Sequence, residues 1–169
     1  MNRIVLFAGQ KTVEPIRALT LLVCIAITIA SSALAQSTNS VLTVILHGKC
    51  WLKVGKNEQP CIPKLLNSNY PGGRTGFYIT GKDDTIYTWS GASGHKPDSN
   101  SQVINVDQFI MSAKGETTGH PATGTCNYQN PYEGKPTRLT CKAQYANQSV
   151  EFKFEHDGSI PIDDVLPAP

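Results

Sequence analysis

The feature that most restricts the fold of this chain is a two-residue alternation of apolar and polar side chains near its C-terminal end. Between residues 138 and 145, and again between 150 and 155, apolar residues alternate with polar or charged ones. Successive side chains of a strand point to opposite faces, so this pattern predicts half-buried antiparallel strands. In most of the remaining sequence, glycine and proline interrupt every window long enough to hold a helix.

Further strand-like segments occupy residues 41–47, 75–80 and 85–90, and polar or glycine-rich turns follow at 55–59, 67–73 and 81–84. A long polar loop is expected at 91–101. Residues 102–111 have apolar spacing that suits a helix and β-branched content that suits a strand, and we favour the strand. The expected fold class is all-β, a small antiparallel sandwich or barrel of about seven or eight strands.

Four cysteines follow residue 35, namely Cys50, Cys61, Cys126 and Cys141. An even number of cysteines in a small exported domain indicates disulfides. Three connectivities are possible, and the spacing favours two local pairs, Cys50–Cys61 and Cys126–Cys141, each closing a hairpin. If Cys126 lies opposite Cys141, Tyr128 faces Leu139. Zinc sites use closely paired ligands, which this spacing does not provide, so no metal is expected.

The N-terminal segment has the pattern of an export signal. Basic residues precede an uninterrupted apolar run at 18–30, and small residues at Ala33 and Ala35 flank Leu34. We predict a cleavable signal peptide at 1–35, a single β domain at 36–158, a proline-rich tail at 159–169 and a periplasmic or secreted location. A membrane anchor is the alternative, but a span needs about 20 apolar residues. No membrane span is expected after cleavage.

Removal of residues 1–35 changes the charge of the chain. The remaining sequence has 12 basic and 12 acidic residues, so its formal net charge is zero. Nucleic-acid binders carry a basic stripe, and here lysine and arginine are spread singly, so nucleic acid is not an expected partner. No cofactor motif is recognisable.

Side chains with possible chemistry are scattered along the sequence. The four histidines lie in different segments and are expected at surfaces or strand ends, and no catalytic residue is predicted from them. The pairs Asp83-Asp84 and Asp163-Asp164 lack the spacing of a calcium loop. Arg74 lies at a glycine-rich turn and could contact an acidic partner. Trp89 is expected to pack in the core, with a binding face as the alternative.

The region from 45 to 158 resembles small exported bacterial proteins of unassigned function. Similar features are the early C-x10-C hairpin, the P-G-G-R-T-G-F segment at 71–77, the cysteine hairpin at 124–143 and F-x-F-x-x-D-G at 152–158. This resemblance implies periplasmic or secreted residence. The segment Ser90–Lys96 is also similar to the S-A-S-G loop of periplasmic inhibitors of C-type lysozyme. That similarity implies that Ser93 enters the enzyme's cleft and Lys96 meets an acidic catalytic residue.

Three functions follow as hypotheses. The first is a non-enzymatic exported domain that binds a protein or envelope component, with Arg74, Trp89, Ser93 and Lys96 as candidate binding residues. The second is an inhibitor of a cell-wall hydrolase. The third is a small hydrolase, which would require two histidines to converge on a pocket with an acidic residue.

Overall fold

The computed structural model describes residues 40–167, and the predicted signal peptide lies outside this range. The described residues form ten β-strands and one short 3-10 helix. In chain order these are β1 (Ser40–Val54), β2 (Asn57–Gln59), β3 (Cys61–Asn69), β4 (Arg74–Gly81), β5 (Ile86–Ser93), β6 (Ser101–Ala113), β7 (Glu116–Gln129), η1 (Pro131–Glu133), β8 (Arg138–Tyr145), β9 (Gln148–His156) and β10 (Ile162–Pro167).

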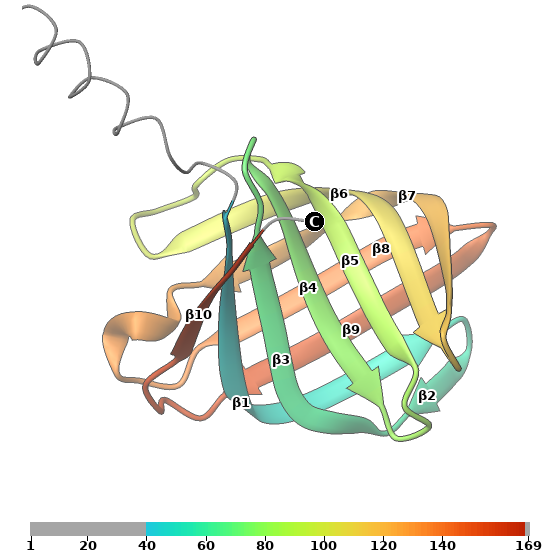
Figure 1. Ribbon diagram of the computed structural model, residues 1–169, viewed down its shortest axis with the longest axis horizontal. Coiled ribbons are helices and arrows are strands. Elements are labelled where there is room, and N and C mark those ends of the chain that lie inside the picture. Colours follow the sequence, from blue (N-terminus) through green and yellow to red (C-terminus); the bar gives the residue numbers. More distant parts are fainter. Residues whose placement is uncertain (1–39, 168–169) are drawn as a thin grey trace, which may run out of the picture. The chain divides into compact units, whose positions relative to one another are not determined.

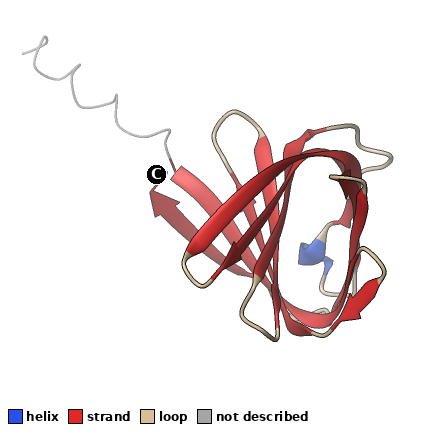
Figure 2. Cartoon of the chain, turned by 90° about the vertical axis from the view of Figure 1, so that its right-hand side faces the viewer, coloured by secondary structure: helices blue, strands red, loops and turns tan. Residues whose placement is uncertain are grey.

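Eight of these strands close into an antiparallel barrel (Figure 1). Neighbouring strands follow the order β1-β3-β4-β5-β6-β7-β8-β9, and β9 pairs back onto β1. Figure 2 shows the strands as a closed ring, with η1 at the opening farther from the viewer. The all-β prediction and its barrel form are therefore confirmed, and residues 102–111 lie in a strand, β6.

Strand β1 makes different pairings along its length. Its first half, from Ser40 to Ile45, pairs with β10, and its second half, from Gly48 to Val54, pairs with β9. Gly48 lies opposite His156 at the change of partner. A Cβ atom at Gly48 would lie 2.0 Å from the carbonyl oxygen of Glu155, so the close approach of β1 to β9 requires glycine here.

The barrel interior is filled by large apolar side chains. The alternation seen in the sequence places one face of each strand inward, and these residues form one hydrophobic cluster. Its largest fully buried members include Trp89, Phe77, Phe109, Phe152 and Phe154. Trp89 packs edge-on against Phe152, with ring centroids 4.6 Å apart. The barrel thus has a packed core, as small barrels of eight strands commonly do.

Both predicted disulfides are present. Cys50–Cys61 joins β1 to β3 across the β1–β2 hairpin, and Cys126–Cys141 joins β7 to β8. Cys126 lies directly opposite Cys141, and Tyr128 lies opposite Leu139, as predicted. Among the residues that the structure describes, none forms a helix that could span a membrane.

Two predicted boundaries differ from the structure. The turn expected at 67–73 begins later, because Asn67 and Ser68 are buried within β3. Ser68 shares a hydrogen bond with Thr43 of 3.0 Å, and the side-chain amide of Asn67 donates to the Gly76 carbonyl at 3.3 Å. These partners satisfy the buried polar groups inside a sheet.

The C-terminal segment also differs from the predicted surface tail. Residues 162–167 form β10, which pairs with the first half of β1. Pro167 is tolerated at the end of β10 because β10 is an edge strand, which has no partner on its outer side within the described residues. The domain therefore extends past residue 158.

Removal of the buried disulfide between β7 and β8 should destabilise the barrel measurably. Replacing both Cys126 and Cys141 with alanine should lower the free energy of unfolding by about 3 kcal/mol, because the crosslink closes a loop with a sequence separation of 15. Urea denaturation of the variant and the native protein, both oxidised, measures the difference. An unchanged midpoint and slope would contradict this role of the crosslink.

Candidate functional site

A pocket of about 820 Å3 lies where β9 ends and β1 changes partner. Backbone hydrogen bonds hold the surrounding segments together: the His156 amide donates to the Thr137 carbonyl at 2.9 Å, and the Asp157 amide to the His47 carbonyl at 3.0 Å. The pocket is lined by His47, Gly48, Lys49, Pro63, Gln129, Pro136, Thr137, Arg138, Glu155, His156 and Asp157. We call this the His156 pocket.

His156 is the most unusual of these residues. It continues the inward-facing series of Val150, Phe152 and Phe154 on β9, and only 2% of it is exposed. Within the described part of the chain, neither ring nitrogen has a hydrogen-bond partner. The nearest carboxylate oxygen, on Asp157, is 3.8 Å from Nε2. Both ring nitrogens are closed to solvent. An unsatisfied buried polar group costs about 1–3 kcal/mol, so the ring of His156 destabilises the wall of this pocket.

The charged groups of the His156 pocket are mixed in sign. Lys49 and Arg138 are cationic, and Glu155 lies 3.5 Å from the Arg138 Nε atom in a mostly exposed ion pair. Hydrogen bonds from Ser159 hold the pKa of Asp157 below its ordinary value. Asp157 is therefore a carboxylate at neutral pH.

Three smaller pockets continue from the His156 pocket around the same end of the barrel. They have volumes of about 320, 240 and 270 Å3 and lie between the 94–100 loop, the end of β7 and the connection from η1 to β8. Gln129 lines two of them and the His156 pocket as well. The Asn130 amide donates to the Asn100 carbonyl at 2.8 Å, which joins the loop to η1. We call these three pockets the polar groove.

Tyr128 and Tyr132 connect this end of the barrel to β10. The Tyr132 hydroxyl donates to the carboxylate of Asp163 on β10. Burial raises the pKa of Tyr128 to about 12, and the charge of Asp163 contributes to the shift. The Tyr128 ring packs on Phe77 of the core, with centroids 5.7 Å apart, so it links the core to the polar groove that it lines.

The residues predicted to bind a ligand are not gathered at one place. Trp89 is fully buried in the core, where a ligand on the surface does not contact it. Arg74 donates two hydrogen bonds to Asp107, of 2.9 and 2.8 Å, and a third to Ser90 of 3.0 Å. Hydrogen bonding to Asp107 raises the pKa of Arg74 above its ordinary value. Arg74 is thus engaged with its own chain across β4, β5 and β6.

Ser93 and Lys96 lie nearer to the polar groove. Ser93 accepts a hydrogen bond of 3.1 Å from the side-chain amide of Gln102, and Lys96 lines one of the three small pockets. Both residues are exposed. Their insertion into a lysozyme cleft stays a prediction.

Two of the four histidines line the same pocket together with acidic residues. His47, His156, Glu155 and Asp157 all line the His156 pocket, which is the convergence that the hydrolase hypothesis requires. The lining includes no serine or cysteine, so a nucleophile would have to be water or the Thr137 hydroxyl. Among the described residues, no group of three or more histidine, cysteine or acidic side chains could hold a metal ion.

Most residues of this site were not among the predicted binding residues. The alternation along β9 places position 156 on the inward face after Phe154, and this pattern could have indicated the burial of His156. The amide-rich segment Asn127–Asn130 is also recognisable in the sequence. Its proximity to residue 47 and to the 94–100 loop follows only from the closed barrel.

Comparison with known proteins gives no family for this chain. No family model, no curated protein and no solved structure matches it.

Alkaline titration tests the environment of Tyr128. Tyrosines ionise near pH 10 in an unfolded chain, whereas Tyr128 has a pKa of about 12 in the fold. Between these values the unfolded state loses its proton first, so stability should fall as pH rises. In absorbance titrations at the phenolate band, Tyr128→Phe should reduce the amplitude above about pH 11 and leave the step near pH 10 unchanged. Loss of amplitude near pH 10 would contradict this burial.

Proposed function

We propose that this protein is an exported, non-enzymatic binding domain that holds a component of the cell envelope at the η1 end of its barrel. The observation that carries this proposal is the His156 pocket, where a buried imidazole without a protein partner lines a cavity of about 820 Å3. Cavities of about 300–1,000 Å3 are typical of sites for small ligands.

The packed core indicates that a ligand would bind outside the barrel interior. Trp89 and four phenylalanines occupy the barrel interior, so a ligand is expected at the loops and strand ends, where a rigid scaffold usually carries its binding residues. The two disulfides lie close to this site. Cys50 follows Lys49 directly, and Cys126–Cys141 joins the strands that carry Gln129 and Arg138. A crosslinked site loses less conformational entropy on binding.

The disulfides also support an exported location. Structural disulfides persist in oxidising compartments such as the periplasm and the extracellular space. The apolar segment at 18–30 and the small residues at 33 and 35 give the route to that compartment. A periplasmic or secreted location is therefore part of this proposal.

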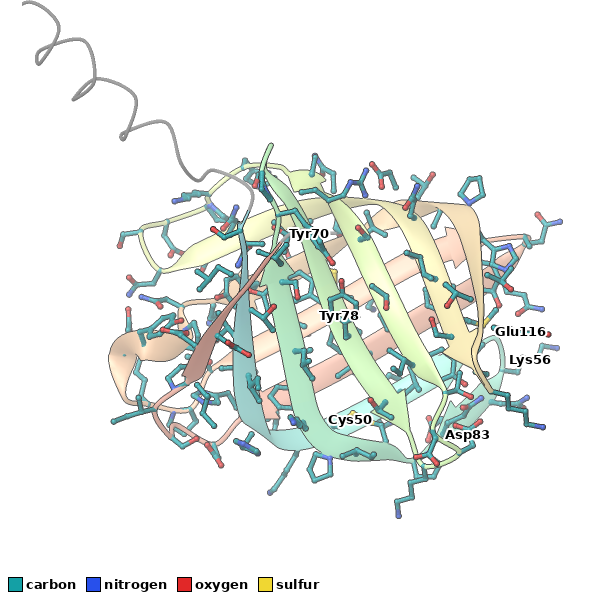
Figure 3. The ribbon with its side chains drawn as sticks, in the orientation of Figure 1. Cys50, Lys56, Tyr70, Tyr78, Asp83 and Glu116 are labelled. Atoms are coloured by element: carbon teal, nitrogen blue, oxygen red, sulfur yellow. A yellow bond between two sulfur atoms is a disulfide. The ribbon has the colours of Figure 1, made fainter. Side chains whose placement is uncertain are left out.

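The site can be tested by immobilising the protein at micromolar concentration, incubating it with envelope extract and measuring how much of a bound component is recovered. Lys49→Ala with Arg138→Ala removes two cations from the His156 pocket and should reduce recovery of the bound component about tenfold, a loss of about 1.4 kcal/mol. Lys56→Ala with Lys82→Ala is the matched control, because it removes the same charge from exposed turns. Figure 3 shows Lys56 and neighbouring Asp83 and Glu116 at the end of the barrel away from η1.

The control variant should recover as much of the component as the native protein. Equal recovery by the pocket variant and the control would contradict the proposed site. Failure of the native protein to recover any component would contradict the binding function itself.

A further inference from the structure

The His156 pocket and the polar groove together have balanced charge. Four lining residues are cationic and four are anionic: Lys49, Lys96, Lys135 and Arg138, and Asp98, Glu133, Glu155 and Asp157. Lys135 forms an ion pair with Glu133, and Arg138 with Glu155. With neutral histidines, the formal net charge of the lining is zero. A surface that selects a polyanion or a polycation concentrates one sign of charge, so this lining favours an uncharged ligand.

Amide side chains in this region have hydrogen-bonding atoms that remain available. Gln129 uses its Oε1 atom to accept from the Arg138 amide at 2.8 Å, and Asn130 uses its Oδ1 atom to accept from the Tyr132 amide at 3.1 Å. Within the described residues, the NH2 group of each has no protein acceptor. Gln102 shows the opposite arrangement to Gln129 and Asn130. Its NH2 group donates to the Ser93 hydroxyl, so its oxygen atom is the one that remains available to a ligand.

Asn127 and Thr140 extend this set between β7 and β8. They lie directly opposite each other in the register and line the same small pocket. Neither side chain hydrogen-bonds to another group in the part of the chain that the structure describes. The groove therefore offers donors and acceptors side by side. Hydroxyl groups, which both donate and accept, are the ligand groups that match such a mixture.

The lining is poorly suited to a peptide. Strand addition requires an unpaired strand edge, but the β7 backbone near the groove pairs on both sides, with Gln102 opposite Tyr128 and Thr140 opposite Asn127. Peptide and protein partners also depend on a few apolar or aromatic anchors. The exposed large apolar side chains of the described residues lie outside these four pockets.

We propose that the ligand is a linear, uncharged oligosaccharide, with one end in the His156 pocket and the rest along the polar groove. This inference rests on the proposed binding function and names the ligand class for that site. Shared lining residues, such as Gln129, make the four pockets one elongated surface. The terminal sugar lies in the His156 pocket beside Lys49 and Arg138, and the amides of the groove bind the following units.

Titration calorimetry of the full chain tests this ligand class. The probes are the tetramer of β-1,4-linked N-acetylglucosamine, cellotetraose and maltotetraose, each compared with its own monosaccharide. At least one tetrasaccharide should bind with a Kd about tenfold or more below that of its monosaccharide. Its affinity should change less than about twofold between about 50 and 500 mM salt, because an uncharged ligand is not screened.

Variants of the groove locate the binding. Asn127→Ala with Thr140→Ala should raise the Kd of the bound tetrasaccharide about tenfold. The matched control is Asn57→Ala with Thr118→Ala, which removes the same two side-chain types from other exposed strand positions and should leave the Kd unchanged. Far-ultraviolet circular dichroism and urea midpoints establish that both variants are folded.

The inference is overturned if none of the three tetrasaccharides binds at about 10 mM, a concentration that detects dissociation constants in the millimolar range. It is also overturned if the groove variant binds as the native protein does, or if added salt abolishes binding. A component recovered from envelope extract through Lys49 and Arg138 that releases no monosaccharide on acid hydrolysis would exclude the glycan and leave the binding function standing.

Discussion

Closure of the barrel depends on the antiparallel pairing of β1 with β9. Gly48 lies at the point where this pairing ends, so close to β9 that a Cβ atom would be 2.0 Å from the carbonyl oxygen of Glu155. The pairing removes two open sheet edges and lets eight strands enclose one apolar core. Cys50–Cys61 holds β1 to β3 next to this junction, so the crosslink and the closure stabilise the same part of the barrel.

The change of partner along β1 also creates the His156 pocket. Because β1 leaves β10 after Ile45 and pairs with β9 only from Gly48 on, the last inward residue of β9 lies at a gap between the two pairings. His156 occupies that position, buried like the phenylalanines before it but carrying two polar atoms. The feature that closes the barrel therefore places a polar side chain at its rim, beside the amide-rich end of β7. The pairing of β1 with β9 therefore determines both the closure of the barrel and the position of the proposed ligand site.

The sequence predicted much of the fold because strand alternation and cysteine spacing are local properties. The opposition of Cys126 and Cys141 followed from them, and the structure confirms it. Buried polar residues were harder to predict. Asparagine is typical of turns, and Asn67 can be buried in a strand only because its side-chain amide donates a hydrogen bond to the carbonyl of Gly76, which lies on the neighbouring strand. The site was harder still. Arg74 lies at a glycine-rich turn and was predicted to contact an acidic partner. Its guanidinium instead donates two hydrogen bonds to the carboxylate of Asp107, which is distant in the sequence. The residues that line the pocket with His156 come from four other segments of the chain.

The barrel interior is filled by apolar side chains, and the proposed ligand site lies outside it, at the end of the barrel that carries His156. Nuclear magnetic resonance tests this directly, because the Trp89 indole N–H reports on the core and the His156 ring nitrogens report on the pocket. During titration with a bound oligosaccharide or a component recovered from envelope extract, the His156 ring signals should shift while the Trp89 indole signal stays in place. A shift of the Trp89 signal with unchanged His156 signals would contradict this location of the site.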